Sequence, residues 1–193
     1  MKGNSLIIIP TYNESENIEL IINKILLLND TNDILVVDDN SPDGTSKIVL
    51  DLKKENIDRI FLIVRDNKLG LGSAYKEGFN WALNQNYSYI FEMDADLSHD
   101  PEEIVNLKEL LIKSDSDVAV GSRYLDGVSV VNWPLSRIFL SYFANIYVRI
   151  ITGMPIKDAT SGFIGYTNES LSSLNIDNIK FNGYAFQIEM KFK

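Results

Sequence analysis

Residues 6–28 read LIIIPTYNESENIELIINKILLL, and this stretch decides the fold class. It begins with four consecutive apolar residues, a pattern typical of a strand that is buried on both faces of a parallel sheet. A helical pattern follows, because apolar residues recur three and four positions apart on one face, at Ile18, Ile21, Ile22, Ile25 and Leu28. A buried strand that leads into an amphipathic helix predicts a sheet flanked by helices.

The same alternation continues as far as residue 120. Short apolar runs predict further strands over 34–37, 60–64, 89–93 and 118–120, and helical patterns predict helices over 43–55, over 73–84 and after Pro101. Beyond Arg123 we expect a glycine-containing loop, an amphipathic helix over 135–151, a short strand over 162–166 and a helix from Gly183. The sequence therefore predicts an α/β fold with a mostly parallel sheet, built as one domain over residues 1–193.

The composition narrows the classes of function. The chain carries 27 acidic and 18 basic residues, and its net charge of -9 disfavours nonspecific binding to nucleic acid, which needs clustered Lys and Arg. It has no cysteine, which excludes disulfides, zinc–thiolate sites and thiol nucleophiles. No apolar run reaches the roughly 20 residues that span a bilayer, and no signal-peptide pattern precedes the first strand, so we expect a cytoplasmic protein.

Acidic side chains follow the fourth predicted strand, at the edge of an open α/β sheet where ligands bind. Asp94 and Asp96 are two residues apart in an extended segment, so their side chains point the same way and can share one cation. Oxygen ligands favour Mg²⁺ or Mn²⁺ over zinc. An isolated Asp-x-Asp is more often a solvated turn, but its position after a buried strand favours a metal site.

Three other features each allow two interpretations. Asp38 and Asp39 could accept hydrogen bonds from a nucleotide, or they could form the turn and cap the helix that follows. The glycines of residues 70–72 match no complete phosphate-binding fingerprint and favour a role in helix packing. His99 is the only histidine, and its position favours shielding or tuning of the acidic site over general-base catalysis.

The predicted helix over 135–151 has two distinct faces. We expect its apolar stripe to pack mainly in the core; the stripe consists of Leu135, Ile138, Phe139, Tyr142, Phe143, Ile146 and Ile150. Another face carries polar residues at four-residue steps, namely Arg137, Ser141, Asn145 and Arg149. Because arginine forms paired hydrogen bonds with phosphate, Arg137 indicates an anion site on this second face.

Several motifs follow one another in an order that is much more specific than any of them alone. They are Pro10-Thr11-Tyr12-Asn13-Glu14, Val37-Asp38-Asp39-Asn40-Ser41-Pro42-Asp43-Gly44-Thr45, Lys68-Leu69-Gly70-Leu71-Gly72-Ser73-Ala74-Tyr75, Met93-Asp94-Ala95-Asp96-Leu97-Ser98-His99, Gly121-Ser122-Arg123-Tyr124, Asn132-Trp133, Asp158-Ala159-Thr160-Ser161-Gly162-Phe163 and Gly183-Tyr184-Ala185-Phe186-Gln187-Ile188-Glu189-Met190. Over nearly the whole chain this series resembles the glycosyltransferase family 2 enzymes, and specifically the dolichyl-phosphate (polyprenyl-phosphate) mannosyltransferases.

The resemblance implies a GT-A fold, which is Rossmann-like, and transfer of mannose from GDP-mannose to a polyprenyl or dolichyl monophosphate with inversion at the anomeric carbon. It places five residues around the nucleoside: Pro10, Tyr12, Glu14, Val37 and Asp39. It places Asp94, Ala95 and Asp96 at the donor diphosphate, where Asp94 and Asp96, with Ser98 by position, would hold Mg²⁺ or Mn²⁺. Arg123 and Arg137 would contact the phosphates of donor or acceptor, and Asp158 would orient the acceptor or the sugar.

The resemblance also leaves alternatives. Relatives continue beyond the Gln187-x-Glu189-Met190 helix, so the chain is expected to be a C-terminally truncated domain and could be a catalytically incomplete fragment that only binds a nucleotide sugar. A second alternative is a family 2 transferase that uses a UDP-sugar, such as a polyprenyl-phosphate glucosyltransferase. Since the acceptor is a lipid, we expect peripheral contact with the cytoplasmic face of a membrane, or a membrane-anchoring partner.

Overall fold

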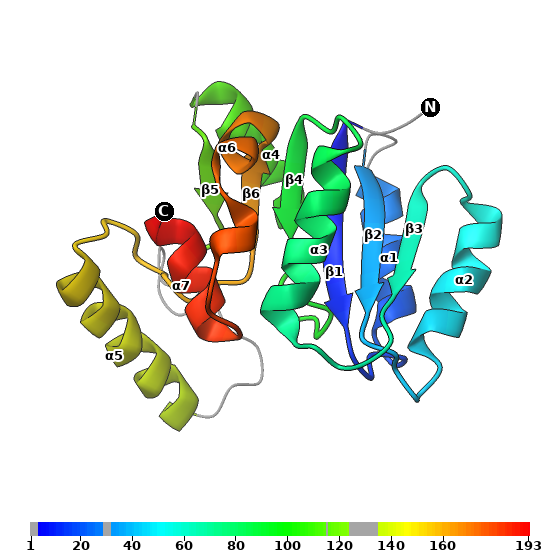
Figure 1. The fold of residues 1–193 in the computed structure, drawn as a ribbon, viewed down its shortest axis with the longest axis horizontal. Helices are drawn as coiled ribbons and strands as arrows, with labels where there is room; N and C mark the ends of the chain where they lie inside the picture. The colour runs from blue at the N-terminus through cyan, green and yellow to red at the C-terminus, as the bar shows by residue number, and fades with distance from the viewer. Residues whose placement is uncertain (1–3, 29–31, 115, 124–134) are drawn as a thin grey trace.

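The computed structural model of the chain describes residues 4–28, 32–114, 116–123 and 135–193. Six strands form one sheet in the order β3-β2-β1-β4-β6-β5 (Figure 1). The strands are β1 (Ser5–Thr11), β2 (Asn32–Asp38), β3 (Ile60–Val64), β4 (Tyr89–Glu92), β5 (Val118–Val120) and β6 (Ile164–Thr167). β6 runs antiparallel to both of its neighbours, and the other pairs are parallel. The predicted α/β class and the mostly parallel sheet are confirmed.

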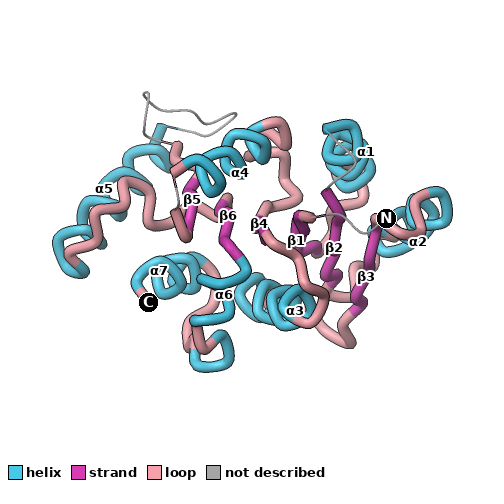
Figure 2. The backbone as a smooth tube through the Cα atoms, turned by 90° about the horizontal axis from the view of Figure 1, so that it is seen from above, coloured by secondary structure: helices cyan, strands magenta, loops and turns pink. Residues whose placement is uncertain are grey.

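Helices cover both faces of this sheet (Figure 2). They are α1 (Ile18–Leu28), α2 (Thr45–Glu55), α3 (Leu71–Leu83), α4 (Glu103–Lys113), α5 (Leu135–Thr152), α6 (Asn168–Ser173) and α7 (Tyr184–Phe192), with a 3₁₀ turn at Ile176–Asn178. In Figure 2, α1, α2 and α4 lie on one side of the strands and α3, α6 and α7 on the other.

Alternate residues of the central strands supply the two cores. Ile7 and Ile9 of β1 face the α1, α2 and α4 side, whereas Leu6 and Ile8 face the α3 and α7 side. All four are fully buried, which explains why β1 is continuously apolar rather than alternating. This double burial holds the strand ends rigidly and fixes the loops that follow β1, β2 and β4 at one edge of the sheet.

The prediction that the apolar stripe of α5 packs mainly in the core is wrong. Seven apolar side chains of α5 are 49–75% exposed: Phe139, Leu140, Tyr142, Phe143, Tyr147, Ile150 and Ile151. Asn145, from the polar face, is instead 3% exposed and turned toward the protein. The helical period revealed an amphipathic helix, but it does not reveal which face meets the protein. We call these seven residues the α5 apolar face, and α5 itself lies at the edge of the molecule (Figure 1).

No helix in the part of the chain that the structure describes is both long enough and apolar enough to cross a membrane.

Candidate active site

The loops after β1 and β2 are joined by the carboxylate of Asp38. Its Oδ1 accepts hydrogen bonds from Thr11 Oγ1 (2.7 Å) and Ser41 Oγ (2.6 Å), and its Oδ2 accepts one from the Ser41 backbone N–H (2.9 Å). The side chain is fully buried. Of the two interpretations open for Asp38, the structure therefore supports the turn-forming one.

Asp39 lies at the same turn but connects it to the segment before α3. Arg65 Nε donates to Asp39 Oδ1 (2.5 Å), and the backbone N–H groups of Leu69 and Gly70 donate to Oδ2 (3.1 and 3.0 Å). Arg65 also bonds Ser73 Oγ and the Gly70 carbonyl at the start of α3. A buried ion pair thus fixes residues 69–73 against the carboxyl end of β2.

These loops enclose a cavity of about 360 Å³ at the carboxyl ends of β1, β2 and β4. Seven sequence-predicted residues line it together: Pro10, Tyr12, Glu14, Asp39, Asp94, Ala95 and Asp96. The cavity is also lined by six residues for which the sequence predicted no ligand contact, namely Thr11, Lys68, Gly70, Leu71, Ala74 and Gly183. Val37 is not among the lining residues, because it is fully buried on the α3 side of the sheet.

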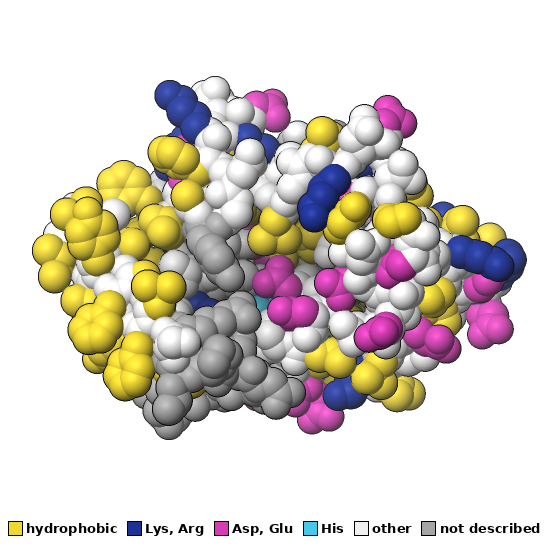
Figure 3. All heavy atoms as spheres, turned by 90° about the horizontal axis from the view of Figure 1, so that it is seen from below, with side chains coloured by type: hydrophobic (Ala, Val, Ile, Leu, Met, Phe, Trp, Pro, Cys, Tyr) yellow, Lys and Arg dark blue, Asp and Glu magenta, His cyan; other side chains and the backbone are white. Residues whose placement is uncertain are grey.

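The cavity is strongly acidic, as Figure 3 shows for this face of the molecule. Burial raises the pKa of Glu14, and the charges of Asp96, Asp43 and Asp94 add to the rise, although a hydrogen bond from Asn17 opposes it. Among the described residues that line the cavity, Lys68 is the one cation; its Nζ lies 3.8 Å from the centre of the Tyr12 ring. A ligand that carries phosphates needs additional positive charge here.

Asp94 is the more rigid of the two carboxylates among the predicted metal ligands. Tyr75 Oη, from α3, donates to Asp94 Oδ1 (3.0 Å), and His99 Nε2 lies 3.8 Å from Oδ2. The backbone at Gly162 approaches so closely that an added Cβ would lie 2.9 Å from Oδ2. Asp96 is exposed, and its Oδ1 accepts a hydrogen bond from the Ser98 backbone N–H (3.0 Å).

This donor set fits a hard divalent cation that is shared with a ligand. Within the described ranges, no group of three or more His, Cys, Asp or Glu side chains is arranged to hold a metal ion. Mg²⁺ and similar ions commonly bind through one or two carboxylates and complete their shell with water and substrate phosphates. Asp94 and Asp96 at the mouth of the cavity meet this requirement.

Tyr75→Phe is expected to weaken Mn²⁺ binding by about 10–100-fold, because the hydroxyl that orients Asp94 is removed and partners behind a metal ligand have effects of that size. Electron paramagnetic resonance of free Mn²⁺ measures the affinity. Tyr87→Phe is the matched control, since Tyr87 is a buried tyrosine that donates to the carboxylate of Asp33 (2.9 Å) on β2, outside the cavity. Equal Mn²⁺ affinities for the two variants would contradict this role of Tyr75.

Arg123 and Asp158 form a second buried group. Arg123 Nε and Nη2 donate to the two oxygens of Asp158 (2.7 and 2.6 Å), and the Arg123 backbone N–H donates to the same carboxylate (3.1 Å). Burial alone would raise the pKa of Asp158, but the hydrogen bonds and charge of Arg123 outweigh it and lower the pKa. Asn145 of α5 contributes by accepting a hydrogen bond from the Ala159 N–H (2.8 Å).

The structure places the remaining predicted residues as follows. Arg123 and Asp158 lie together, but neither lines the 360 Å³ cavity. Ser98 directs its backbone N–H to Asp96. Arg137 lies on α5, and its side chain is outside the part of the chain that the structure describes. The imidazole of His99 stacks on Phe163 with ring centres 5.0 Å apart, an arrangement consistent with shielding of Asp94.

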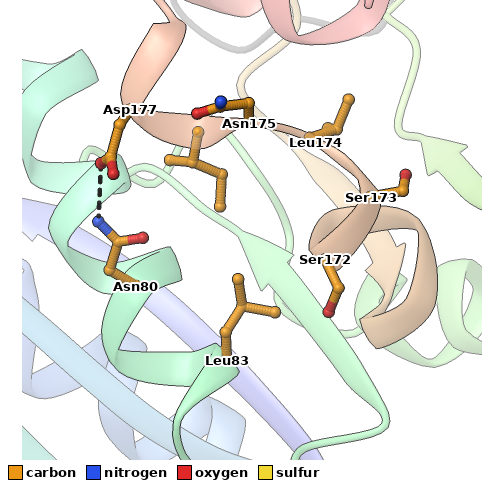
Figure 4. A pocket seen from close by; sticks show the side chains of 8 residues that line it. Asn80, Leu83, Ser172, Ser173, Leu174, Asn175 and Asp177 are labelled. Atoms are coloured by element: carbon orange, nitrogen blue, oxygen red, sulfur yellow. Dashed lines mark hydrogen bonds between the residues drawn. The ribbon is translucent and has the colours of Figure 1, made fainter.

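A second hollow of about 360 Å³ lies between α3 and the α6 segment (Figure 4). It is lined by Asn80, Leu83 and residues 172–177, and the Asn80 amide bonds Asp177 across it (3.3 Å). Asp177 is the one charged residue among those that line it, so this hollow offers little to bind a phosphorylated ligand. The cavity beside Asp94 and Asp96 is therefore the candidate active site.

Comparisons with known proteins identify the family of the chain. Residues 6–174 match the family described as Glycosyl transferase family 2. The chain is 43% identical over 189 residues to a polyprenol monophosphomannose synthase of Mycolicibacterium smegmatis, covering 98% of this chain and 71% of that protein. It is 39% identical over 188 residues to an undecaprenyl-phosphate mannosyltransferase of Micrococcus luteus, covering 97% of this chain and 76% of that protein.

Solved structures share the fold at lower identity. A mannosyltransferase of Pyrobaculum calidifontis, in complex with GDP-Man and Mn²⁺, superposes with a TM-score of 0.58 at 22% identity and covers 91% of this chain and 47% of that one. The glucosyl-3-phosphoglycerate synthase of Mycobacterium tuberculosis gives a TM-score of 0.67 at 20% identity, covering 95% and 62%. The sheet, the acidic cavity at its carboxyl edge and the family match lead to one conclusion: the chain is a GT-A glycosyltransferase and belongs to glycosyl transferase family 2.

Proposed function

We propose that this chain transfers mannose from GDP-mannose to a polyprenyl monophosphate, with inversion at the anomeric carbon and with the help of a divalent cation. One observation carries the proposal above all. Four of the five residues predicted to bind the nucleoside and the two predicted carboxylate ligands of the metal come from different strand ends, yet they line a single cavity. The names of the two sequence relatives support the choice of mannose and of a polyprenyl phosphate acceptor.

The chemistry requires no strong general base. A phosphate monoester is largely ionised near neutral pH, so an acceptor oxygen can attack directly. That oxygen forms the new bond to C1 of mannose while the bond from C1 to the donor diphosphate breaks, and the electron pair leaves with GDP. A cation held by Asp94 and Asp96 would supply positive charge at the departing diphosphate.

The remaining predicted residues would orient the phosphates of donor or acceptor and stabilise their charge. Asp158 fixes the Arg123 guanidinium with both of its oxygens, and this preorganised group would contact a phosphate of donor or acceptor. Arg137 on α5 is proposed for the same kind of contact. Asp158 itself is committed to Arg123 in this structure, which favours an orienting role over direct contact with the reacting sugar.

The choice of donor can be tested through ligand protection. A ligand that binds only the folded state raises the melting temperature, so the chain should melt higher with GDP-mannose and Mn²⁺ than with Mn²⁺ alone. UDP-glucose and UDP-N-acetylglucosamine, each with Mn²⁺, are the comparison ligands. A larger shift with either UDP-sugar would transfer the proposal to a UDP-dependent family 2 enzyme.

We further propose that the α5 apolar face meets the membrane that holds the acceptor. The seven side chains form a contiguous exposed apolar surface, of a kind that marks an interaction site. In Figure 3 this surface and the acidic cavity lie on the same face of the molecule. A bilayer contacting α5 would therefore also lie close to the cavity mouth, where a lipid-linked phosphate has to arrive.

Phe139→Ser combined with Phe143→Ser is expected to weaken binding to phosphatidylcholine vesicles by about tenfold or more, because each buried Phe contributes about 1.5–3 kcal/mol. Both rings are 60% exposed, so the fold should be retained. Flotation with vesicles measures the bound fraction, and Ile57→Ser, at an exposed apolar residue outside α5, is the control. If the double variant floats as the wild type does, and if the wild type forms a dimer that the two substitutions dissociate, this face would instead bind a protein partner.

A further inference from the structure

Residues 158–163, which we call the bridging loop, link the Arg123–Asp158 ion pair to the carboxylate of Asp94. Asp158 and Thr160 accept hydrogen bonds from Arg123. Gly162 packs against the Asp94 carboxylate, where a Cβ would be 2.9 Å from Oδ2, and Phe163 stacks on His99. The position of this loop therefore affects the predicted metal ligand and the predicted phosphate-binding arginine together.

Lys191 holds the bridging loop from α7. Its Nζ donates to the backbone carbonyls of Ala159 (3.0 Å) and Ser161 (2.7 Å), and also to the Gln187 carbonyl on its own helix (3.3 Å). A lysine ammonium has three donors, so all three are used on backbone oxygens. Burial lowers the pKa of Lys191 to about 8, although the charges of Glu92 and Asp158 favour its protonated form.

The helix that carries Lys191 is itself anchored to the strand that leads to Asp94. Gln187 Nε2 donates to Glu92 Oε2 (2.5 Å), and Tyr166 Oη donates to Glu92 Oε1 (2.9 Å). Glu92 is fully buried on β4 and precedes Asp94 by two residues. Phe186 and Met190 pack in the core against α3. A rigid path therefore leads from β4 through α7 to the bridging loop.

We propose that Lys191 is a positioning residue of the transferase: by binding the carbonyls of Ala159 and Ser161 it fixes the bridging loop, and thereby the carboxylate of Asp94 and the guanidinium of Arg123. Lys191 touches neither donor nor acceptor in this account. The importance of Lys191 for transfer rests on the proposed function. Its effect on the position of the bridging loop does not, and can be measured without turnover.

His99 supplies a direct probe of the loop. It is the only histidine of the chain, so proton NMR gives one set of imidazole signals, and its stacking on Phe163 shifts those signals through the ring current. At one fixed pH above the histidine titration range, Lys191→Met is expected to move the His99 signals toward the chemical shifts of an imidazole that is not stacked on a ring. The same variant should weaken Mn²⁺ binding by about tenfold, measured by electron paramagnetic resonance with GDP and again with UDP.

Chemical restoration separates the ammonium from general packing. The chain has no cysteine, so Lys191→Cys can be alkylated with 2-bromoethylamine at that position only, which rebuilds a lysine-like ammonium. Alkylation should restore both the His99 signals and the Mn²⁺ affinity. Lys193→Met and Lys193→Cys are the matched controls. Lys193 is the next lysine along the chain; it is exposed and donates to the Asn178 carbonyl, so its variants should leave the His99 signals and the Mn²⁺ affinity unchanged.

The outcomes are distinct. Unchanged His99 signals in a folded Lys191→Met protein, or signals that alkylation fails to restore, would overturn the positioning role. If the wild type binds Mn²⁺ with UDP but not with GDP, the proposed donor is wrong. The Mn²⁺ affinities of the wild type and the Lys191 variants, measured with UDP, would still test the positioning role of Lys191. Circular dichroism confirms that each variant is folded before it is compared.

Discussion

Asp96→Asn is expected to reduce mannose transfer by about a thousandfold while the chain stays folded. The reason is that Asp96 is one of two carboxylates placed to hold a divalent cation, and such an ion supplies several kcal/mol of transition-state charge stabilisation. Each 1.36 kcal/mol corresponds to a factor of ten in rate. Asp96 is exposed and its backbone position depends on β4, so loss of one charge should hardly change stability.

The measurement is single-turnover transfer at saturating GDP-mannose over a range of Mn²⁺ concentrations. Asp100→Asn is a suitable control, because Asp100 is an exposed carboxylate in the same loop that does not line the cavity. Transfer at wild-type rate by Asp96→Asn would remove this residue from the site. Partial recovery at high Mn²⁺ would instead support the assigned role, since the remaining ligand Asp94 can still bind the ion weakly.

Asp158→Ala is expected to lower the free energy of unfolding by about 3–5 kcal/mol, because it leaves the largely buried Arg123 guanidinium without its fully buried carboxylate partner. Chemical unfolding near neutral pH measures the loss. Asp51→Ala provides the contrast, since Asp51 pairs with Lys54 on the surface and its loss should not shift the unfolding midpoint. A loss no larger than that of Asp51→Ala would show that the Arg123–Asp158 pair contributes little to the fold.

The effect of Asp158→Ala should depend on pH in a definite direction. The pKa of Asp158 is lower in the folded than in the unfolded chain, so the ionised carboxylate stabilises the fold at pH values above its unfolded pKa of about 4. This contribution is lost as the pH falls through the folded pKa. The difference between wild type and Asp158→Ala should therefore be full at pH 7 and shrink in acid; a constant difference would contradict the ion-pair account.

The central part of the fold could be predicted from sequence because local patterns coincide with the tertiary structure there. The continuous apolar runs of β1 and β2 can be buried on both faces only between two layers of helices. The acidic residues that follow these strands must then lie at the carboxyl edge of the sheet. The side-chain chemistry that follows β4 could be anticipated for the same reason. Asp94 and Asp96 then needed no long-range information to be placed near Tyr12 and Glu14.

Other features depend on contacts between distant residues and could not be found from local patterns. Arg123 and Asp158 are separated by 35 positions, and Lys191 reaches Ser161 across 30. Neither pair has a characteristic spacing, so the sequence suggested Arg123 and Asp158 without showing that they pair, and it did not point to Lys191. The outward direction of the α5 apolar face was missed for a different reason: hydrophobic period identifies a face but carries no information about the neighbour that covers it.

Mannosyl transfer to a lipid acceptor can be measured directly, by following radiolabelled mannose from GDP-mannose into organic-extractable polyprenyl phosphate with and without Mn²⁺. Labelled lipid is expected to form only with both Mn²⁺ and the polyprenyl phosphate present, and to disappear in Asp96→Asn. Absence of labelled mannose from the lipid phase, with the wild-type chain folded and Mn²⁺ and both substrates present, would contradict the proposed transfer.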